Sequence, residues 1–246
     1  GWDNSVWRLG PDLAVRIPRR RAAVDLLVNE LRWLPGLAPQ LTLPVPVTVT
    51  VGAPTPRYPW PWSICRWVPG RAWHDEPPAD PTPAARALAS FLRALHQPAP
   101  DGAPTSSFRG GALASRDDVV RERAATTAHL IDVAPLLVLW DRALAARDSR
   151  RALGSWVHGD LHPLNVVCDG ESLSGVLDFG DLTRGDPAVD LSAAWTIFDE
   201  PARAVLLAEY GADPDVALRA AGWAINHGLA CLAGSADHSA VAAIGR

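Results

Sequence analysis

The sequence predicts an α+β protein of two lobes, a small antiparallel sheet with one helix followed by a larger and mainly helical lobe. Short strand patterns separated by Gly and Pro turns fill the first quarter of the chain, and one helical pattern interrupts them. Beyond residue 67 helical spacing dominates, and 246 residues are enough for two lobes. We therefore predict an N-terminal lobe over residues 1–67 and a C-terminal lobe over residues 68–246.

The strands of the N-terminal lobe are predicted from their alternation and from the turns between them. Residues 5–10 (SVWRLG), 13–18 (LAVRIP) and 45–51 (VPVTVTV) carry β-branched or aromatic residues between turn residues. We expect a last strand and the exit from the lobe within residues 55–70, which are rich in Pro and Trp. Residues 19–34 form the interrupting helix. Its apolar positions recur at helical spacing: Val24, Leu27, Leu31 and Leu34.

The C-terminal lobe is predicted to begin with a helix over residues 82–96, with Thr82 as its N-cap and Pro83 in its first turn. A second helical region covers residues 115–146. Prolines mark a break in that region and the starts of two later helices: Pro135, Pro201 and Pro214. Residues 156–181 form a strand-rich island within this helical lobe.

The composition describes an ordinary globular protein, because 48% of the residues are apolar and 20% are charged. Its three cysteines lack metal-ligand spacing and favour a reducing compartment. No apolar run approaches the roughly 20 residues that span a bilayer, and no leader is visible. We therefore expect a cytoplasmic protein with no membrane partner. All 23 Lys and Arg residues are Arg. Met is absent and there is no initiator, which suggests either that the start of the natural chain is missing or that Met positions are missing from the sequence.

The charge is unevenly distributed along the chain. Residues 1–159 carry 19 Arg against 14 acidic residues, whereas residues 160–246 carry 4 Arg against 13 acidic residues. An acidic C-terminal third disfavours nucleic acid as a partner and attracts a cation, either a metal ion or a polycationic small molecule. A solvated acidic surface is the alternative interpretation.

The island contains polar residues among apolar strands. Residues 164–168 and 173–177 read as the two strands of a hairpin, which brings Asp178 beside Asn165 and leaves Asp160 on the preceding loop. A carboxamide oxygen and a carboxylate are a small set of hard oxygen ligands, which suits Mg²⁺ completed by water and phosphate. The spacing therefore predicts a metal site for nucleotide phosphates.

Two coupled motifs in the island resemble those of kinases. Asp160 and Asn165 match the D-x-x-x-x-N pattern of the kinase catalytic loop, and residues 178–180 (DFG) match the metal-binding triplet. The segments HGDLHPLN and LDFGDLTRGDPAVDL resemble the aminoglycoside phosphotransferase family, whose members have a bilobal, protein-kinase-like fold. The resemblance implies transfer of the γ-phosphate of ATP, or GTP, to a hydroxyl of a small molecule. It also implies Asp160 as the catalytic base and Asn165 and Asp178 as Mg²⁺ ligands.

The same resemblance implies which residues bind the nucleotide. Arg16 stands where kinases have a phosphate-binding Lys, and Glu30 on the following helix would be its partner. Residues 64–67 would form the hinge that faces the purine, so Ile64 and Arg66 are expected at the nucleotide. The segment GWDN at residues 1–4 is a candidate loop over the phosphates, although it lacks the kinase glycine pattern.

The remaining polar residues of the island have structural interpretations. We expect His158 to fix the loop backbone and His162 to pack within the loop, while Asp181 either contacts the metal indirectly or faces solvent. Asp186 is expected to be a helix N-cap and Asp190 to be an acid in the first turn of that helix. The structural alternative for Asp160 is a carboxylate that caps the loop.

Acceptors in the family range from aminoglycosides, macrolides and peptide antibiotics to metabolites such as choline or homoserine. The acidic balance favours a cationic acceptor, lined by some of five acidic residues: Asp199, Glu200, Glu209, Asp213 and Asp215. Two rival functions remain open. A metal-dependent hydrolase would use His158, Asp160 and His162 as ligands, and a nonenzymatic pseudokinase would bind nucleotide without transferring phosphate.

Overall fold

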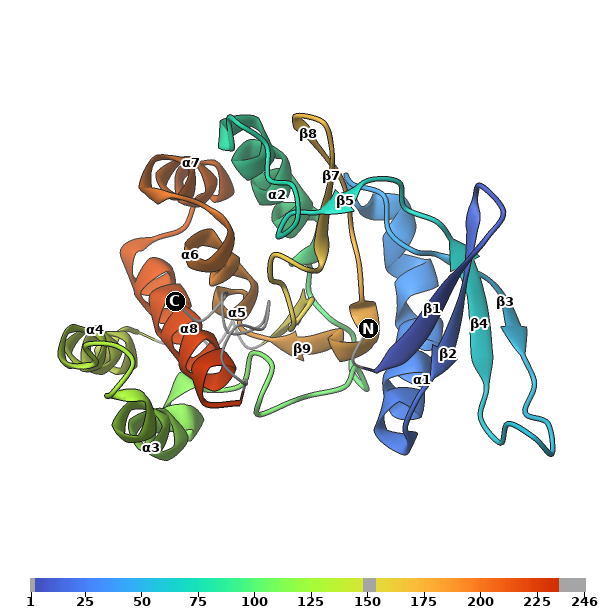
Figure 1. Ribbon diagram of the computed structural model, residues 1–246. Coiled ribbons are helices and arrows are strands. Elements are labelled where there is room, and N and C mark those ends of the chain that lie inside the picture. The colour runs from blue at the N-terminus through green and yellow to red at the C-terminus, as the bar shows by residue number, and fades with distance from the viewer. Residues whose placement is uncertain (1–2, 148–153, 235–246) are drawn as a thin grey trace.

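The structure is a computed structural model that describes residues 3–147 and 154–234. Figure 1 shows two lobes, one made of a four-stranded sheet with a long helix and the other made of helices around two small sheets. The predicted α+β class and the division into a small antiparallel lobe and a larger, mainly helical lobe are confirmed. The boundary at residue 67 stays a prediction, since the chain leaves the first sheet at Arg66 and enters the next strand at Arg71.

The N-terminal sheet is antiparallel, with the strand order β1-β2-β4-β3. Its strands are β1 (Asn4–Leu9), β2 (Leu13–Pro18), β3 (Thr48–Gly52) and β4 (Trp62–Arg66). Val15 in β2 lies opposite Trp7 in β1 and Ile64 in β4. Because neighbouring side chains of a strand point to opposite faces, Arg16 projects from the other face of the sheet than Val15.

Helix α1 (Arg21–Leu37) follows β2 and lies alongside the sheet in Figure 1. Its buried stripe includes Val24, Leu27 and Leu34, as predicted from the helical spacing. The helix runs three residues beyond the predicted end, because Pro35 lies close enough to its C-terminus to be tolerated. The stripe also contains Glu30, a buried acid that needs a partner.

Two small sheets form the island. Strands β5 (Arg71–Ala72), β7 (Val166–Asp169) and β8 (Ser172–Val176) make one sheet, and β6 (Ser155–Val157) pairs with β9 (Thr183–Gly185). The β7–β8 hairpin has the predicted register, with Val166 opposite Val176. The backbone N–H of Leu177 donates to the carbonyl of Asn165 at 2.8 Å, which places Asp178 at the same end of the hairpin.

Helices make up the rest of the C-terminal lobe. They are α2 (Thr82–Leu95), α3 (Asp117–Thr127), α4 (Ala134–Ala145), α5 (Ala188–Leu191), α6 (Ala193–Ile197), α7 (Glu200–Tyr210) and α8 (Pro214–Gly234). Helix α2 packs against α7, and α8 packs against α3, α4 and α5. The predicted break near Pro135 falls between α3 and α4, and helices begin at the two later prolines as expected.

The expected N-cap at Thr82 is wrong by one residue. Thr82 is already helical, and its N–H donates to Oδ1 of Asp80 at 2.9 Å. Asp80 therefore satisfies a backbone donor of the first turn, which the Pro-rich context had obscured. Within the described ranges, no helix combines the length and the apolar character needed to cross a bilayer.

Candidate active site

A cavity of about 350 Å³ lies between the two lobes. It is bounded by β1 and β2 on one side, by residues 65–70 at the connection between the lobes, and by the β7–β8 hairpin on the other side. The polar side chains that line this cavity include Arg16, Asn165 and Asp178. Its size and its mainly apolar walls suit a small-molecule site with a few oriented polar groups.

Arg16 and Glu30 form the predicted pair at this cavity. The guanidinium of Arg16, only 7% exposed, donates through Nη1 to Oε1 of Glu30, which is 1% exposed. Its Nη2 lies 3.3 Å from Oδ1 of Asp178. Burial opposes the charge of Arg16, but the carboxylates of Glu30 and Asp178 outweigh it and hold the pKa of Arg16 above its usual value. A permanent cation therefore stands next to the predicted metal ligand.

Three of the four residues expected in the hinge, 65–67, line the cavity, and Ile64 does not. Ile64 pairs through its backbone with β2 and β3, its side chain shares the sheet face of Val15, and it is not among the residues that line the cavity. Arg66 does line it, together with Cys65 and Trp67. The structure thus brings Arg66 to the cavity and leaves Ile64 in the sheet, because alternation turns Ile64 away from the face that carries Arg16.

Asp178 has a backbone conformation that side chains rarely adopt. Its φ of 62° and ψ of 72° lie in the left-handed region, and no other non-glycine residue of the described chain has a positive φ. Such a conformation costs about 1–3 kcal/mol and is kept where the surroundings impose it. The neighbouring Phe179 is fully buried and packs edge-on against the rings of Phe91 and His158.

Helix α1 is fastened to the same segment by a residue that the sequence did not reveal. Nδ2 of Asn29 donates to the carbonyl oxygens of Gly180 at 2.9 Å and Leu182 at 2.7 Å. A Cβ at Gly180 would lie 2.9 Å from Cβ of Leu26, so only glycine allows this close approach. An Asn within a helical pattern carries no local signal of such a contact.

The buried carboxylate of Asp190 holds the loop before β7 in place through hydrogen bonds. Asp190 accepts hydrogen bonds from the N–H of His158 at 2.6 Å and of Gly159 at 2.8 Å, and Nε2 of His96 lies 3.0 Å from it. Burial opposes its ionisation, but the hydrogen bond from His96 and the backbone donors keep the pKa of Asp190 below its usual value. Asp190, which was expected only as an acid in the first turn of a helix, therefore anchors this loop, although it lies 31 residues after Gly159.

His158 fixes the loop backbone, as expected. The ring is fully buried, its Nδ1 accepts from the N–H of Asp160 at 3.2 Å, and its Nε2 donates to the carbonyl of Leu177 at 2.9 Å. Both ring nitrogens are thus used by the backbone. The expected N-cap Asp186 is displaced by one position: its Oδ1 accepts from the N–H of Ala188, and Arg219 donates to its Oδ2 at 2.7 Å.

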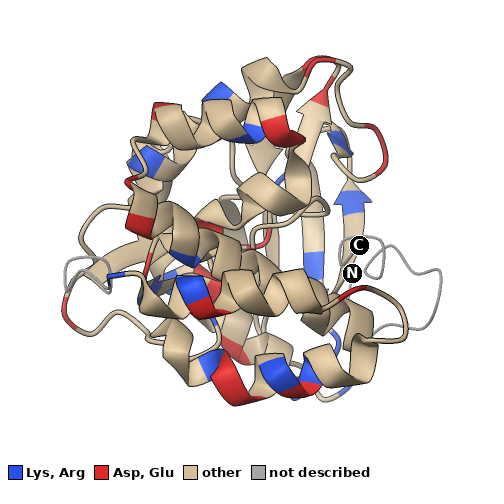
Figure 2. Cartoon of the chain, turned by 90° about the vertical axis from the view of Figure 1, so that its left-hand side faces the viewer, with Lys and Arg blue, Asp and Glu red and all other residues tan. Residues whose placement is uncertain are grey.

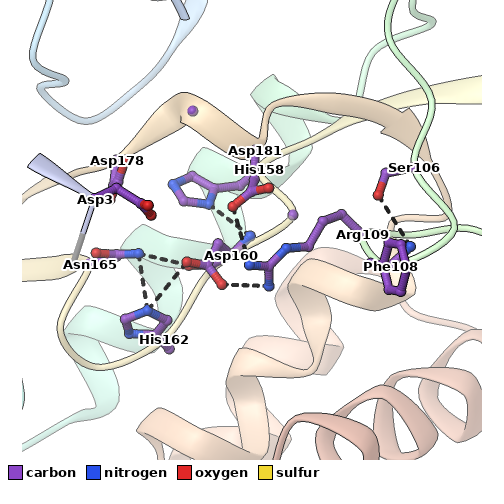
Figure 3. A network of polar contacts seen from close by, with 12 residues as sticks. Asp3, Ser106, Phe108, Arg109, His158, Asp160, His162, Asn165, Asp178 and Asp181 are labelled. Atoms are coloured by element: carbon purple, nitrogen blue, oxygen red, sulfur yellow. Dashed lines mark hydrogen bonds and ion pairs between the residues drawn. The ribbon is translucent and has the colours of Figure 1, made fainter. Parts of the chain in front are cut away.

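Asp160 lies at the centre of the network in Figure 3. Its Oδ1 accepts from Nη1 of Arg109 at 2.6 Å, and Nε2 of His162 lies 3.5 Å from its Oδ2. Nδ2 of Asn165 donates to its backbone carbonyl at 2.9 Å. Burial raises the pKa of Asp160, but the contact with His162 and the charge of Arg109 outweigh burial and hold it below the usual range. His162, expected only to pack, therefore faces the carboxylate.

Arg109 is the main feature of the site that sequence reasoning missed. It comes from the connection between α2 and α3, and its Nη2 also lies 3.2 Å from Oδ2 of Asp181. Asp181, for which two roles were open, thus faces Arg109, and burial raises the pKa of its carboxyl group. A lone Arg in a Ser- and Gly-rich segment, 51 residues before Asp160, gives no sequence signal of this contact.

The donor set at the hairpin end fits Mg²⁺. Asn165 uses its amide nitrogen on the carbonyl of Asp160, which leaves its side-chain oxygen as an acceptor. The Asp178 side chain is 46% exposed and lines the cavity. In residues 3–147 and 154–234, no group of three or more His, Cys, Asp or Glu side chains could hold a metal ion. The hydrolase alternative needs His158 as a metal ligand. Both ring nitrogens of His158 already contact the backbone, which weakens this alternative.

The segment at residues 1–4 is partly at the cavity. Asp3 and Asn4 line it, while residues 1–2 of the candidate phosphate loop lie outside the described residues. Nε of Arg20 donates to Oδ1 of Asp3 at 2.7 Å, so that the carboxylate beside the cavity is paired.

The five acids expected to line an acceptor site have other positions. Asp199 and Asp213 accept from backbone N–H groups at the starts of α7 and α8, and Glu209 pairs with Arg86 at 2.7 Å. Glu200 and Asp215 lie in the first turns of the same two helices. Figure 2 shows acidic and basic residues interspersed over the helical lobe. In the described residues these acids stand at helix starts or in an ion pair, and whether any of them lines an acceptor site stays a prediction.

Known proteins match both the sequence and the structure. The phosphotransferase enzyme family, APH, matches residues 1–224. The uncharacterized protein YcbJ of Bacillus subtilis (strain 168) is 32% identical over 143 residues, which are 55% of this chain and 44% of that protein. The chain thus spans less than half the length of this curated relative.

Two solved structures illustrate the likeness of the fold. The GDP and kanamycin complex of APH(2″)-IIia is 22% identical with a TM-score of 0.70, covering 94% of this chain and 82% of that chain. The macrolide 2′-phosphotransferase MphH from Brachybacterium faecium is 24% identical with a TM-score of 0.63, covering 99% and 89%. The chain therefore belongs to the phosphotransferase enzyme family and has its protein-kinase-like fold.

Proposed function

We propose that this protein transfers the γ-phosphate of ATP or GTP to a hydroxyl group of a small molecule, in the presence of Mg²⁺. The observation that carries the proposal is the meeting of Arg16, Asn165 and Asp178 at a cavity of about 350 Å³, with Asp160 bound to Asn165 beside it. Similar structures are complexes with GDP, ADP and ATP, which supports a nucleoside triphosphate as donor. Such a donor makes the cytoplasm the proposed compartment.

Each residue has a defined task in this reaction. Arg16 binds phosphate oxygens with a guanidinium that its two carboxylate partners hold in place. Asn165 and Asp178 would hold Mg²⁺, which when bound neutralises charge on the phosphate oxygens. Arg66 and its neighbours contact the base through the connection between the lobes. Apolar side chains of both lobes exclude water from the nucleotide.

Asp160 acts on the acceptor. The acceptor oxygen forms a bond to the γ-phosphorus, the bond from that phosphorus to the bridging oxygen breaks, and the hydroxyl proton passes to the carboxylate of Asp160. The products are a nucleoside diphosphate and a phosphate ester. The partners of Asp160 keep its carboxylate ionised, so that it can accept a hydrogen bond from the acceptor hydroxyl and orient it before the proton is transferred.

The test is a phosphate-transfer assay with ATP and GTP in parallel and a panel of hydroxyl acceptors that includes aminoglycosides, macrolides and small polyols. We expect Mg²⁺-dependent transfer to at least one acceptor, and we expect Asp160→Asn to lower kcat by about 10²-fold or more while leaving nucleotide affinity unchanged. Asp169→Asn is the matched control, because Asp169 is an exposed acid at the far end of the same hairpin.

Three outcomes would count against the proposal. Equal activity of Asp160→Asn and the unchanged chain would exclude Asp160 as the base. Nucleotide binding without transfer to any acceptor would favour the pseudokinase alternative. Absence of nucleotide binding would contradict the assignment of the cavity.

A further inference from the structure

Arg109 joins the two carboxylates of the acceptor side with a single guanidinium. Nη1 lies 2.6 Å from Oδ1 of Asp160, and Nη2 lies 3.2 Å from Oδ2 of Asp181. The side chain is 30% exposed, so the contact is neither a core ion pair nor a loose surface pair. Figure 3 shows the guanidinium beside the carboxylate of Asp160, on the side away from Asn165 and Asp178.

The backbone around Arg109 is fixed on both sides. The carbonyl of Pro104 accepts from the N–H of Arg184 at 2.8 Å, and the carbonyl of Gly110 accepts from the N–H of Asp186 at 2.7 Å. A Cβ at Gly159 would lie 3.1 Å from Cβ of Arg109, so this segment packs closely against the catalytic loop. Arg109 is therefore presented to Asp160 by an anchored segment.

The charge of Arg109 persists in this position. Burial opposes it, but the carboxylates of Asp160 and Asp181 outweigh burial and hold the pKa of Arg109 above its usual value. An ammonium group that approached Asp160 would stand within a few ångströms of this guanidinium. At such distances like charges in a partly buried site repel strongly enough to change affinity by about tenfold or more.

We propose that Arg109 is a positioning and specificity-determining residue. Its guanidinium holds Oδ1 of Asp160, so that the acceptor hydroxyl meets Oδ2, which lies beside His162. Its charge offsets part of the negative charge of Asp160 and Asp181, and so selects acceptors that lack an ammonium group beside the reacting hydroxyl. This inference rests on the proposed function only in taking the side of Asp160 as the acceptor site. It replaces the cationic acceptor that the acidic composition suggested.

The first experiment measures binding by calorimetry and does not need turnover. Kanamycin is the cationic probe, and the fully N-acetylated compound, which keeps the sugar framework but carries no ammonium group, is the neutral probe. We expect kanamycin to bind Arg109→Gln at least tenfold more tightly than the unchanged chain, while Arg109→Lys, which keeps the charge, behaves like the unchanged chain. Arg121→Gln is the matched control, because Arg121 is an exposed Arg that pairs with Asp117 and Asp141 instead of with Asp160.

The second experiment separates positioning from folding. With an active acceptor, Arg109→Gln should lower kcat by about tenfold and leave the KM for nucleotide unchanged, and Arg109→Lys should recover part of kcat. Equal kanamycin affinity in the unchanged chain and Arg109→Gln, including no detectable binding in either, would overturn the inference. Absence of transfer to every acceptor would instead refute the proposed function, and the kanamycin comparison would still decide the role of Arg109.

Discussion

Removal of the carboxylate of Glu30 gives the sharpest test of the nucleotide end of the site. Glu30→Gln leaves the guanidinium of Arg16 buried without its main partner, and loss of one member of a buried pair costs about 3–5 kcal/mol. Asp178 remains 3.3 Å from Arg16, so we expect the lower end, about 3 kcal/mol. For a chain of this length each kcal/mol lowers Tm by about 2–4 °C, which predicts a fall of about 6–12 °C.

Thermal unfolding and nucleotide titration of the same variants provide the assay. Asp25→Asn on the same helix is the control, since its pair with Arg21 is about 70% exposed and should change stability by less than about 0.5 kcal/mol. The double variant Arg16→Met/Glu30→Leu should recover most of the stability, because apolar side chains can replace a buried ion pair, but it should not recover nucleotide affinity. A Glu30→Gln variant with unchanged Tm and unchanged nucleotide affinity would refute the reasoning.

Three further predictions concern the loop and the helix behind it. Gly159→Ala should lose about 1–3 kcal/mol of unfolding free energy and much of its kcat, because φ is +83° and the new Cβ would lie 2.8 Å from the carbonyl of Asp181. Gly170→Ala, also at positive φ but in open space, should lose about 1 kcal/mol in the same denaturation assay and keep its kcat. Asp190→Asn should lower the free energy of unfolding by about 3 kcal/mol and should also lower kcat, because the N–H groups of His158 and Gly159 lose an ionised acceptor. An unchanged kcat would count against the anchoring role of Asp190. Burial lowers the pKa of His227 from 6.5 to about 4, so the unfolded chain binds the extra proton between these values and stability should fall as the pH drops through them. His227→Gln should flatten that dependence in urea unfolding at pH 5 and 7, and an unchanged slope would contradict it.

Local patterns predicted the parts of the site that local contacts build. The hairpin register follows from two strands and a short turn within one island, so Asn165 and Asp178 were expected together and are found together. The pairing of Arg16 with Glu30 was also predicted, but from the resemblance to kinases and not from a local pattern.

The contacts that the sequence did not reveal all span long stretches of chain. Arg109 reaches Asp160 only because the connection between α2 and α3 pairs with β9, and Asn29 reaches Gly180 only because α1 packs on the segment at residues 178–181. Neither side chain has a pattern around it that distinguishes it from an exposed residue. Ile64 lies outside the cavity lining for a different reason, since the strand was expected in residues 55–70 but the face to which each of its side chains points was not predicted.

Asn29 and Glu30 are consecutive residues of one helix, yet they serve different parts of the site. Successive side chains of an α-helix point about 100° apart. Asn29 therefore binds the Phe179–Asp181 turn, while Glu30 binds Arg16. A rotation of α1 about its own axis would lengthen both the contact of Asn29 with Gly180 and the contact of Glu30 with Arg16. One helix therefore holds both the Phe179–Asp181 turn and Arg16, so that a change in the position of α1 would alter the contacts of both at once.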